Sequence, residues 1–353
     1  MQGSIDRVRS VINGDMPDRA PLFDLLRNDA VINHFTGREL TVENGPEVAY
    51  KAYEPAMDAT RPSVGIPSEE KTIVLEDGRE QRCYRWTTWT EQREYADCNA
   101  YVSAKRKEIE LSDPSVWGEA QQRSLDGELA WIAEERRKLG EVFFVPGISR
   151  PGLMGIFGEV GLEAFSYYLA DCPDIIVELL ESNTVRAVTL AEHHPEDHGI
   201  EVGFLGDDIA FNSGPLLSPA WLKEHYFPRL SKVIAAWHAK GTKVLFHSDG
   251  NLNPILDDLV EAGIDGLNPI EVLAGMDVAD IHCRYPHLFM AGGIDVSQLL
   301  PFGSPQQVKD TVKQTIDAAE GRIMIGSSTE LGDEVPLKNY LALREAVFEN
   351  AYA

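Results

Sequence analysis

Short apolar runs alternate with amphipathic segments from one end of the chain to the other. Runs this short, set between segments with helical periodicity, are typical of buried parallel strands. Eight runs of this kind can be drawn, at positions 21–24, 61–66, 142–146, 201–206, 243–246, 265–269, 287–291 and 322–326. Strands that alternate with helices along a whole chain predict an α/β fold, here a (β/α)8 TIM barrel that forms one domain over 1–353.

The helices between these strands begin and end at recognisable residues. Ser218 and Ser304 each precede a proline, so a capping hydroxyl stands before the first helical position. Gly241 and Gly263 follow helical stretches, where a left-handed residue commonly closes the last turn. Both signals support helices on either side of the strand predicted at 243–246.

One stretch departs from the alternation. Two β-type runs flank Asp77-Gly78, a pair that is typical of a tight β-turn. The pattern predicts a hairpin excursion outside the barrel at about 72–102. We expect its Trp86 and Trp89 to pack the hairpin down, the alternative being that they line a substrate entrance.

Composition narrows the functional classes. The formal net charge is −25, which would repel the phosphates of nucleic acid, so we expect no nucleic-acid partner. No apolar run reaches the ~18 residues of a membrane span, and the N-terminus lacks a signal-peptide core, which predicts a cytoplasmic protein with no membrane partner. The scattered Cys83, Cys98, Cys172 and Cys283 predict reduced thiols and no cysteine-based zinc site.

Polar residues directly follow several of the predicted strands. The carboxyl ends of barrel strands meet at one mouth, where barrel enzymes hold their chemistry. His247 and Asp249 are two positions apart at one strand end and therefore point the same way. Asp207 and Asp208 are candidate acid–base residues, the alternative being that either caps the helix near Ser218 or the turn before it.

The strand-end residues include a candidate metal site. His247, Asp249 and Glu271 together offer one nitrogen and several oxygens, which suits a divalent ion with an open position for water or substrate. Zinc fits this set, although oxygen-rich sites also take other metals. The alternative is a metal-free site in which the same residues hydrogen-bond a polar substrate. The further candidates for substrate contact are Asn268, Ser327 and Ser328.

Several segments carry a resemblance to a known family. They are Gly206-Asp-Asp-Ile, Leu217-Ser-Pro-Ala, Phe246-His-Ser-Asp-Gly-Asn, Ala262-Gly-Ile-Asp-Gly-Leu-Asn-Pro-Ile-Glu271, Gly292-Gly-Ile-Asp295 and Val335-Pro-Leu-Lys-Asn339. Together they resemble the uroporphyrinogen decarboxylase superfamily, over about 17–347 and most densely after Gly206. The resemblance implies a (β/α)8 barrel with its site at the strand ends.

The chain departs from a true uroporphyrinogen decarboxylase near its N-terminus. Those enzymes carry a Met-Arg-Gln-Ala-Gly-Arg segment that grips propionate carboxylates. The matching region here retains only Arg27, which becomes a candidate substrate-binding residue. A substrate with many carboxylates would also meet a strongly acidic protein. The resemblance therefore implies a substrate other than uroporphyrinogen.

The chain is more similar to the methyltransferase branch, whose members move methyl groups to or from a corrinoid held by a separate protein. In its thiol-methylating members, a His-x-Cys motif and a later cysteine hold zinc. Here His247 matches the histidine, Asp249 stands in place of the first cysteine, and Ser327 or Ser328 stands near the second. Glu271 matches a carboxylate near that zinc. The loss of sulfur points away from thiols and toward an ether, an alcohol or a carboxylate.

The leading hypothesis is a corrinoid-linked methyltransferase component that demethylates a methoxylated small molecule. It implies one divalent metal, zinc first, and a corrinoid supplied by a partner protein. The catalytic candidates are Asp207, Asp208 and His247, and the metal candidates are His247, Asp249 and Glu271. The alternatives are a lyase or decarboxylase of a small carboxylic acid and a binding protein that keeps the barrel without catalysis. The oligomeric state, a homodimer included, is left open.

Overall fold

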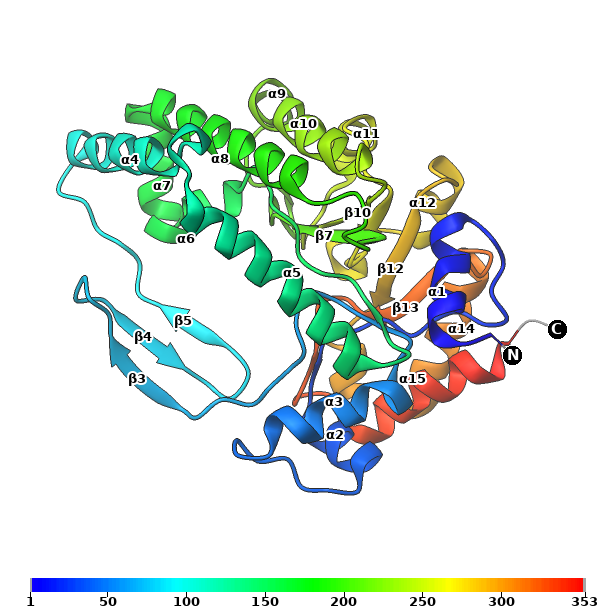
Figure 1. Cartoon of the computed structure of the whole chain (residues 1–353). Helices are drawn as coiled ribbons and strands as arrows, with labels where there is room; N and C mark the ends of the chain where they lie inside the picture. The colour runs from blue at the N-terminus through cyan, green and yellow to red at the C-terminus, as the bar shows by residue number, and fades with distance from the viewer. Residues whose placement is uncertain (1, 352–353) are drawn as a thin grey trace.

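The computed structural model describes residues 2–351, and these form the predicted (β/α)8 barrel (Figure 1). Five parallel strands make one continuous sheet in the order β13-β12-β11-β10-β7. Nearly all of their residues are buried, because helices cover the outer face of the sheet. The strands are β7 Val202–Gly206, β10 Lys243–His247, β11 Gly266–Asn268, β12 Phe289–Ile294 and β13 Ile323–Ser327.

Shorter contacts continue the ring beyond β7. A parallel bridge from Gly147 to Phe204 joins the segment after β6 (Phe143–Phe144) to β7. β6 pairs in turn with β2 (Ala59–Thr60).

Residues 22–23 close the ring between β2 and β13. Phe23 bridges to Ala59 on one side, and Leu22 bridges to Ile325 on the other. The closure depends on Gly326, since a Cβ there would lie 1.8 Å from the carbonyl oxygen of Phe23. Eight strand positions are therefore linked in sequence around the barrel.

The second strand lies earlier in the chain than predicted. β2 is Ala59–Thr60, and the predicted strand at 61–66 is wrong, because those residues form an irregular segment. Pro62 ends the strand, since proline has no N–H to donate and restricts the residue before it. Arg61 consequently stands at the carboxyl end of a strand rather than inside one.

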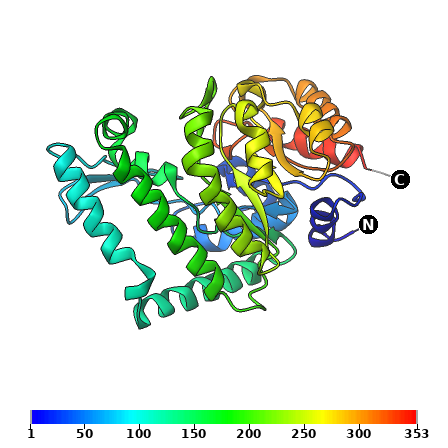
Figure 2. The ribbon, with the colours of Figure 1, turned by 90° about the horizontal axis from the view of Figure 1, so that it is seen from above.

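Helices surround the barrel (Figures 1 and 2), and none within residues 2–351 is long and apolar enough to cross a membrane. The predicted caps are confirmed: the side chain of Ser218 accepts from the N–H of Trp221, and Ser304 forms a capping box with Gln307. The α-helices are α1 Ser4–Asn13, α2 Asp29–Thr36, α3 Gly45–Ala56, α4 Cys98–Ser112, α5 Glu119–Leu139, α6 Leu153–Val160, α7 Leu162–Asp171, α8 Pro173–His193, α9 Pro219–Trp221, α10 Phe227–His238, α11 Leu256–Glu261, α12 Val278–Arg284, α13 Leu299–Phe302, α14 Pro305–Ala318 and α15 Leu337–Glu349. A π-helical turn, Leu222–Tyr226, joins α9 to α10, and the 3-10 turns are Pro114–Val116, Asn253–Ile255 and Val272–Ala274. The remaining short strands are β1 Leu26–Arg27, β8 Ala210–Phe211, β9 Gly214–Pro215 and β14 Leu331–Gly332.

The excursion contains three strands rather than two. β3 (Lys71–Val74), β4 (Glu80–Cys83) and β5 (Thr88–Thr90) form an antiparallel sheet that stands apart from the barrel (Figure 1). The indole N–H of Trp86 donates to Asp333 at 2.6 Å, whereas Trp89 is largely exposed. The predicted end at 102 is wrong, because α4 already begins at Cys98.

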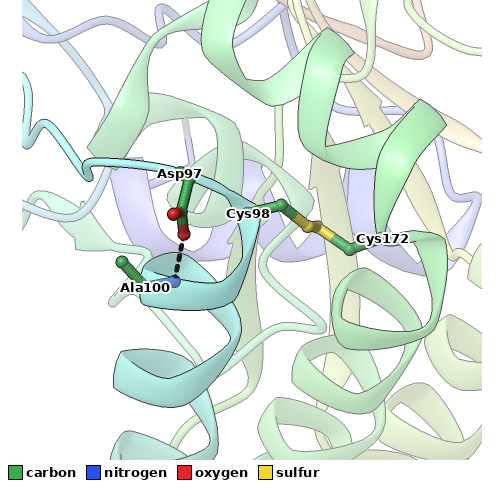
Figure 3. Close-up of a disulfide and its surroundings, with 4 residues drawn as sticks. All are labelled: Asp97, Cys98, Ala100 and Cys172. Atoms are coloured by element: carbon green, nitrogen blue, oxygen red, sulfur yellow. Dashed lines mark hydrogen bonds between the residues drawn. A yellow bond between two sulfur atoms is a disulfide. The ribbon is translucent and has the colours of Figure 1, made fainter.

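The cysteines are not all reduced. Cys98, at the start of α4, forms a disulfide with Cys172, which precedes α8 (Figure 3). The expectation of four free thiols is therefore wrong for this pair, while Cys83 and Cys283 are free. The pairing arises from the packing of α4 beside α8 and joins positions 74 residues apart, so local spacing does not reveal it.

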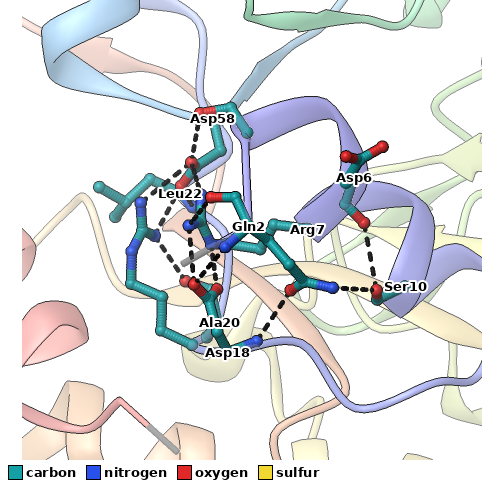
Figure 4. Close-up of polar contacts among 10 residues, drawn as sticks. Gln2, Asp6, Arg7, Ser10, Asp18, Ala20, Leu22 and Asp58 are labelled. Carbon is teal, nitrogen blue, oxygen red and sulfur yellow. Dashed lines mark hydrogen bonds and ion pairs between the residues drawn. The ribbon is translucent and has the colours of Figure 1, made fainter.

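Helix α1 closes the amino-terminal end of the barrel. Its Val8 and Val11 belong to one buried cluster with apolar side chains of the barrel interior. Beside them, the buried carboxylate of Asp58 accepts a hydrogen bond from Arg7 at 2.7 Å (Figure 4). It accepts another from Arg19, also at 2.7 Å. Burial alone would raise the pKa of Asp58, but the hydrogen bond and charge of Arg19 outweigh it, so the pKa lies below its ordinary value.

We predict that Asp58→Asn destabilises the fold by about 3–5 kcal/mol, because it leaves buried Arg19 without a counter-charge and buried Arg7 with Asp18 alone. Urea denaturation at pH 7 measures the loss. The folded-state pKa of Asp58 is lower than the unfolded value, so its contribution is present above about pH 4 and is lost as pH falls through the folded pKa. Glu47→Gln, which breaks exposed pairs with Lys51 and Arg38, is the control and should change little. Equal stability of Asp58→Asn and wild type would contradict this account.

Candidate active site

Strand register sets the level of the candidate site. In the parallel ladder, His247 at the end of β10 is level with Gly206 of β7 and Asn268 of β11. The N–H of Asp207 donates to the carbonyl of His247 at 2.9 Å, which extends the ladder one residue beyond β7. The residues that follow these three strands therefore emerge together at the carboxyl end of the barrel.

Asn268 determines which nitrogen of His247 carries the proton. The amide Nδ2 of Asn268 donates to the carbonyl of Ala291 at 3.0 Å, so its Oδ1 is an acceptor. This Oδ1 lies 2.7 Å from Nδ1 of His247, which we therefore assign as the protonated nitrogen. A guanidinium nitrogen of Arg61 lies 3.3 Å from the same Nδ1, but arginine can only donate, so this contact is not a hydrogen bond in that tautomer.

The other nitrogen of His247 faces two carboxylates. Nε2 lies 3.7 Å from Oδ1 of Asp208 and 3.8 Å from Oδ1 of Asp249. One ligand atom from each of the three residues lies within 4.8 Å of the others. Burial, followed by the charge of Arg61, lowers the pKa of His247 to about 3, so the imidazole is neutral near pH 7. A lone pair facing two anionic oxygens is unfavourable unless a cation lies between them, so this triad suits a divalent metal.

The two carboxylates of the triad are tied to each other. The N–H of Asp249 donates to Oδ1 of Asp208 at 3.1 Å, and the hydroxyl of Thr329 donates to Asp249 at 3.2 Å. Burial raises the pKa of Asp208. Burial, then the nearby charges of Asp208 and Glu271, raises the pKa of Asp249 to about 6. The contributions of Asp208 and Glu271 to the shift of Asp249 reflect crowded negative charge, which a bound cation would relieve.

Glu271 borders the triad, but its carboxylate does not belong to the cluster of possible ligand atoms from Asp208, His247 and Asp249. Its Oε2 accepts from the N–H of Gly250 at 2.6 Å. Gly250 has φ +92°, and a Cβ there would lie 2.7 Å from the backbone of Ala210, so only glycine fits this turn. Glu271 thus holds the loop that carries Asp249, while Asp208 from the neighbouring strand joins His247 and Asp249 in the metal-type cluster.

The carboxylate of Asp207 hydrogen-bonds the N-terminus of helix α6. Its fully buried carboxylate accepts the N–H groups of Gly152, Leu153 and Met154 at 2.8–3.1 Å, and the hydroxyl of Tyr226 at 2.9 Å. It therefore caps α6. The alternative that Asp207 caps the helix near Ser218 is wrong, because Ser218 caps that helix with its own side chain.

The remaining predicted residues lie near the mouth with protein partners of their own. The hydroxyl of Ser327 donates to Asp24 at 2.8 Å, and the hydroxyl of Ser328 accepts from the N–H of Val296 at 3.2 Å. Arg27 pairs with Glu330 at 2.8 Å. Asn268 orients His247, as described above.

Sequence reasoning missed three residues of the site. Asp24 ends the first strand, and the strand-end rule could have found it. Its carboxyl is buried, which raises its pKa to about 6. Arg61 was placed inside the misassigned second strand. Arg150 follows β6 in a segment whose sequence carries no signal, yet its charge acts on both His247 and Asp208.

The fold and the strand-end cluster define a barrel protein with the residue types of an active site. A family model for uroporphyrinogen decarboxylase (URO-D) matches residues 159–349, more than half of the chain. The chain belongs to the uroporphyrinogen decarboxylase family. No curated protein matches this sequence.

Two solved structures are similar to this one. A methyltransferase from Methanosarcina mazei superposes with a TM-score of 0.68 at 20% identity, over 99% of each chain. This likeness shows that the fold is shared along almost the entire length. A putative vitamin-B12 independent methionine synthase from Listeria monocytogenes has a TM-score of 0.39 at 15% identity, over 64% of this chain and 67% of that one, and carries no argument here.

We predict that Asn268→Ala weakens Zn²⁺ binding by about 10- to 100-fold, because His247 loses the acceptor that fixes its tautomer. Competition with a chromophoric chelator measures the affinity. Asn253→Ala removes a comparable amide that bonds only the exposed loop at Gly275, and it should bind Zn²⁺ like wild type. Equal affinities for both variants would show that Asn268 does not support a metal ligand.

Proposed function

We propose that this chain is a methyltransferase component that takes a methyl group from a methoxylated small molecule and passes it to a corrinoid held by a partner protein. The observation that carries the proposal is the lone pair of His247 directed at Asp208 and Asp249. The proposal is further supported by the fold shared with the Methanosarcina methyltransferase.

The donor set favours an oxygen substrate. Asp208, His247 and Asp249 would hold a divalent ion, whose Lewis acidity would polarise an ether oxygen. One nitrogen and carboxylate oxygens form a harder set than thiolates, which suits ether chemistry better than thiol activation. The carboxylate of Asp249 is held in place by Thr329, and the imidazole of His247 is held by Asn268.

The departing oxygen needs a proton when the carbon–oxygen bond breaks with its electron pair on oxygen. The carboxylate of Asp207 is occupied by four donors. Asp208 accepts only the N–H of Asp249 among residues 2–351, at its Oδ1. Of the two acids, Asp208 therefore has an oxygen, Oδ2, that could orient a water molecule as the proton source for the departing oxygen while the carboxylate stays anionic on the metal.

A decarboxylase of a small carboxylic acid is the second candidate. The matching family model is that of a decarboxylase. The buried carboxyl of Asp24 also favours it, because a group with a pKa of about 6 can carry the proton that replaces a lost carboxylate.

We predict that Zn²⁺-loaded protein demethylates methoxylated aromatic compounds only when Co(I) cobalamin or its carrier protein is present. The spectral change of the cobalamin measures turnover. Asp208→Asn and His247→Ala should each lower the rate by about 10²-fold or more, the scale of a positioned acid–base group. Asp280→Asn, at an exposed position of α12, is the matched control and should turn over like wild type.

Other outcomes separate the remaining candidates. Release of carbon dioxide from a small acid without any corrinoid would replace the methyltransferase proposal with the decarboxylase. Ligand binding without either reaction would indicate a binding protein on the same barrel.

A further inference from the structure

Arg61 is a buried cation without a direct ion pair, although the charges of buried Asp24, of Glu330 and of Asp249 act on it from a longer distance. It is 7% exposed, yet no carboxylate among residues 2–351 lies within ion-pair distance of its guanidinium. At the opposite end of the barrel, Arg7 and Arg19 each lie 2.7 Å from Asp58. Buried charges are normally paired, because removing a charge from water costs several kcal/mol. An anion that is not part of the chain could therefore form the direct ion pair that Arg61 lacks.

The contacts of Arg61 hold it in place without neutralising it. One guanidinium nitrogen donates to the carbonyl of Thr329, and the guanidinium carbon lies 5.4 Å from the ring centroid of Phe204. The other terminal nitrogen of Arg61, Nη1, lies 3.3 Å from Nδ1 of His247. Because this Nδ1 carries a proton in the assigned tautomer, it cannot accept a hydrogen bond from Arg61. Arg61 is thus held beside the triad, and several of its N–H groups remain available to donate to a ligand.

Arg150 adds a second uncommitted cation at the same end of the barrel. It follows β6, is exposed, and forms no hydrogen bond or ion pair with any residue that the structure describes. The residues that follow it, Gly152 to Met154, donate to Asp207, the neighbour of Asp208, so Arg150 lies close to the triad. Arg27, by contrast, is already neutralised by Glu330.

We propose that Arg61 and Arg150 bind a carboxylate group of the substrate beside the triad. The planar guanidinium fork matches the two oxygens of a carboxylate. A singly charged carboxylate is favoured over a doubly charged phosphate, because Asp249 and Glu271 already place negative charge at this site. The inference names the substrate class for the proposed function, a methoxylated carboxylic acid, and rests on that function for the methoxy group alone.

Calorimetric titration of the Zn²⁺-loaded full chain tests the carboxylate site. The probes are 3-methoxybenzoate and methoxyacetate, their neutral amides, and 3-methoxyphenyl phosphate. Wild type should bind at least one acid about tenfold or more tighter than the matching amide, the scale of charge-assisted hydrogen bonds. The phosphate should bind more weakly than the benzoate.

The variants assign the preference to the two arginines. Arg61→Met and Arg150→Gln should each weaken acid binding by about tenfold or more while amide binding stays the same. Arg61→Lys keeps the charge but not the fork and should recover part of the loss. Arg123→Gln on the exposed face of α5 is the matched control and should bind like wild type. Because Arg150 is exposed, Arg150→Gln decides the test even if Arg61→Met does not fold.

Three results would overturn the inference. They are equal binding of acid and amide by wild type, including undetectable binding of both; unchanged acid binding in Arg150→Gln; and tighter binding of the phosphate. None of these measurements requires a corrinoid. Arginine-dependent acid binding without methyl transfer would therefore contradict the proposed function and support the carboxylate site. Methyl transfer from the amides, as fast as from the acids, would support the proposed function and contradict the carboxylate site.

Discussion

The candidate site depends on the register of the parallel ladder through β7, β10 and β11. That register sets His247 level with Gly206 and Asn268, so the amide of Asn268 reaches Nδ1 and the residues after Gly206 reach Nε2. A slip of one residue would turn His247 to the other face of its strand and separate it from both. The ladder is buried on both faces and cannot shift without exposing apolar side chains, so the fold itself orients the imidazole.

Buried charges form ion pairs at the amino-terminal end of the barrel and lack them at the carboxyl end. At the amino-terminal end, Asp58 is matched by arginines at hydrogen-bond distance, which stabilises the fold and leaves nothing for a ligand. At the carboxyl end, Asp208 and Asp249 both lie close to one nitrogen of His247, while Arg61 forms no direct ion pair. Such an arrangement is costly in isolation and becomes favourable when a cation and an anion bind. This contrast is typical of barrel enzymes, whose carboxyl-terminal face carries function and whose other face carries stability.

Much of the architecture could be predicted from the sequence, because periodicity and caps are local properties. The barrel, seven of its strands and the caps at Ser218 and Ser304 follow from apolar spacing and from hydroxyl–proline pairs. The second strand was misplaced because β2 is only two residues long and the apolar residues of 61–66 lie in the loop after it. Strand-end polarity likewise marked His247 and Asp249 as functional candidates, since no core position needs an imidazole and a carboxylate together.

The sequence by itself therefore determined the fold and the chemical types at the mouth of the barrel. Only the tertiary structure decided their roles. Asp207 caps α6 and its neighbour Asp208 joins the metal-type cluster, although both acids are equivalent as sequence. Arg61 is buried without an ion pair, whereas Arg27 is paired with Glu330. Each of these differences is a distance between residues on separate strands or helices, and a distance set by packing across the barrel leaves no periodic trace along the chain.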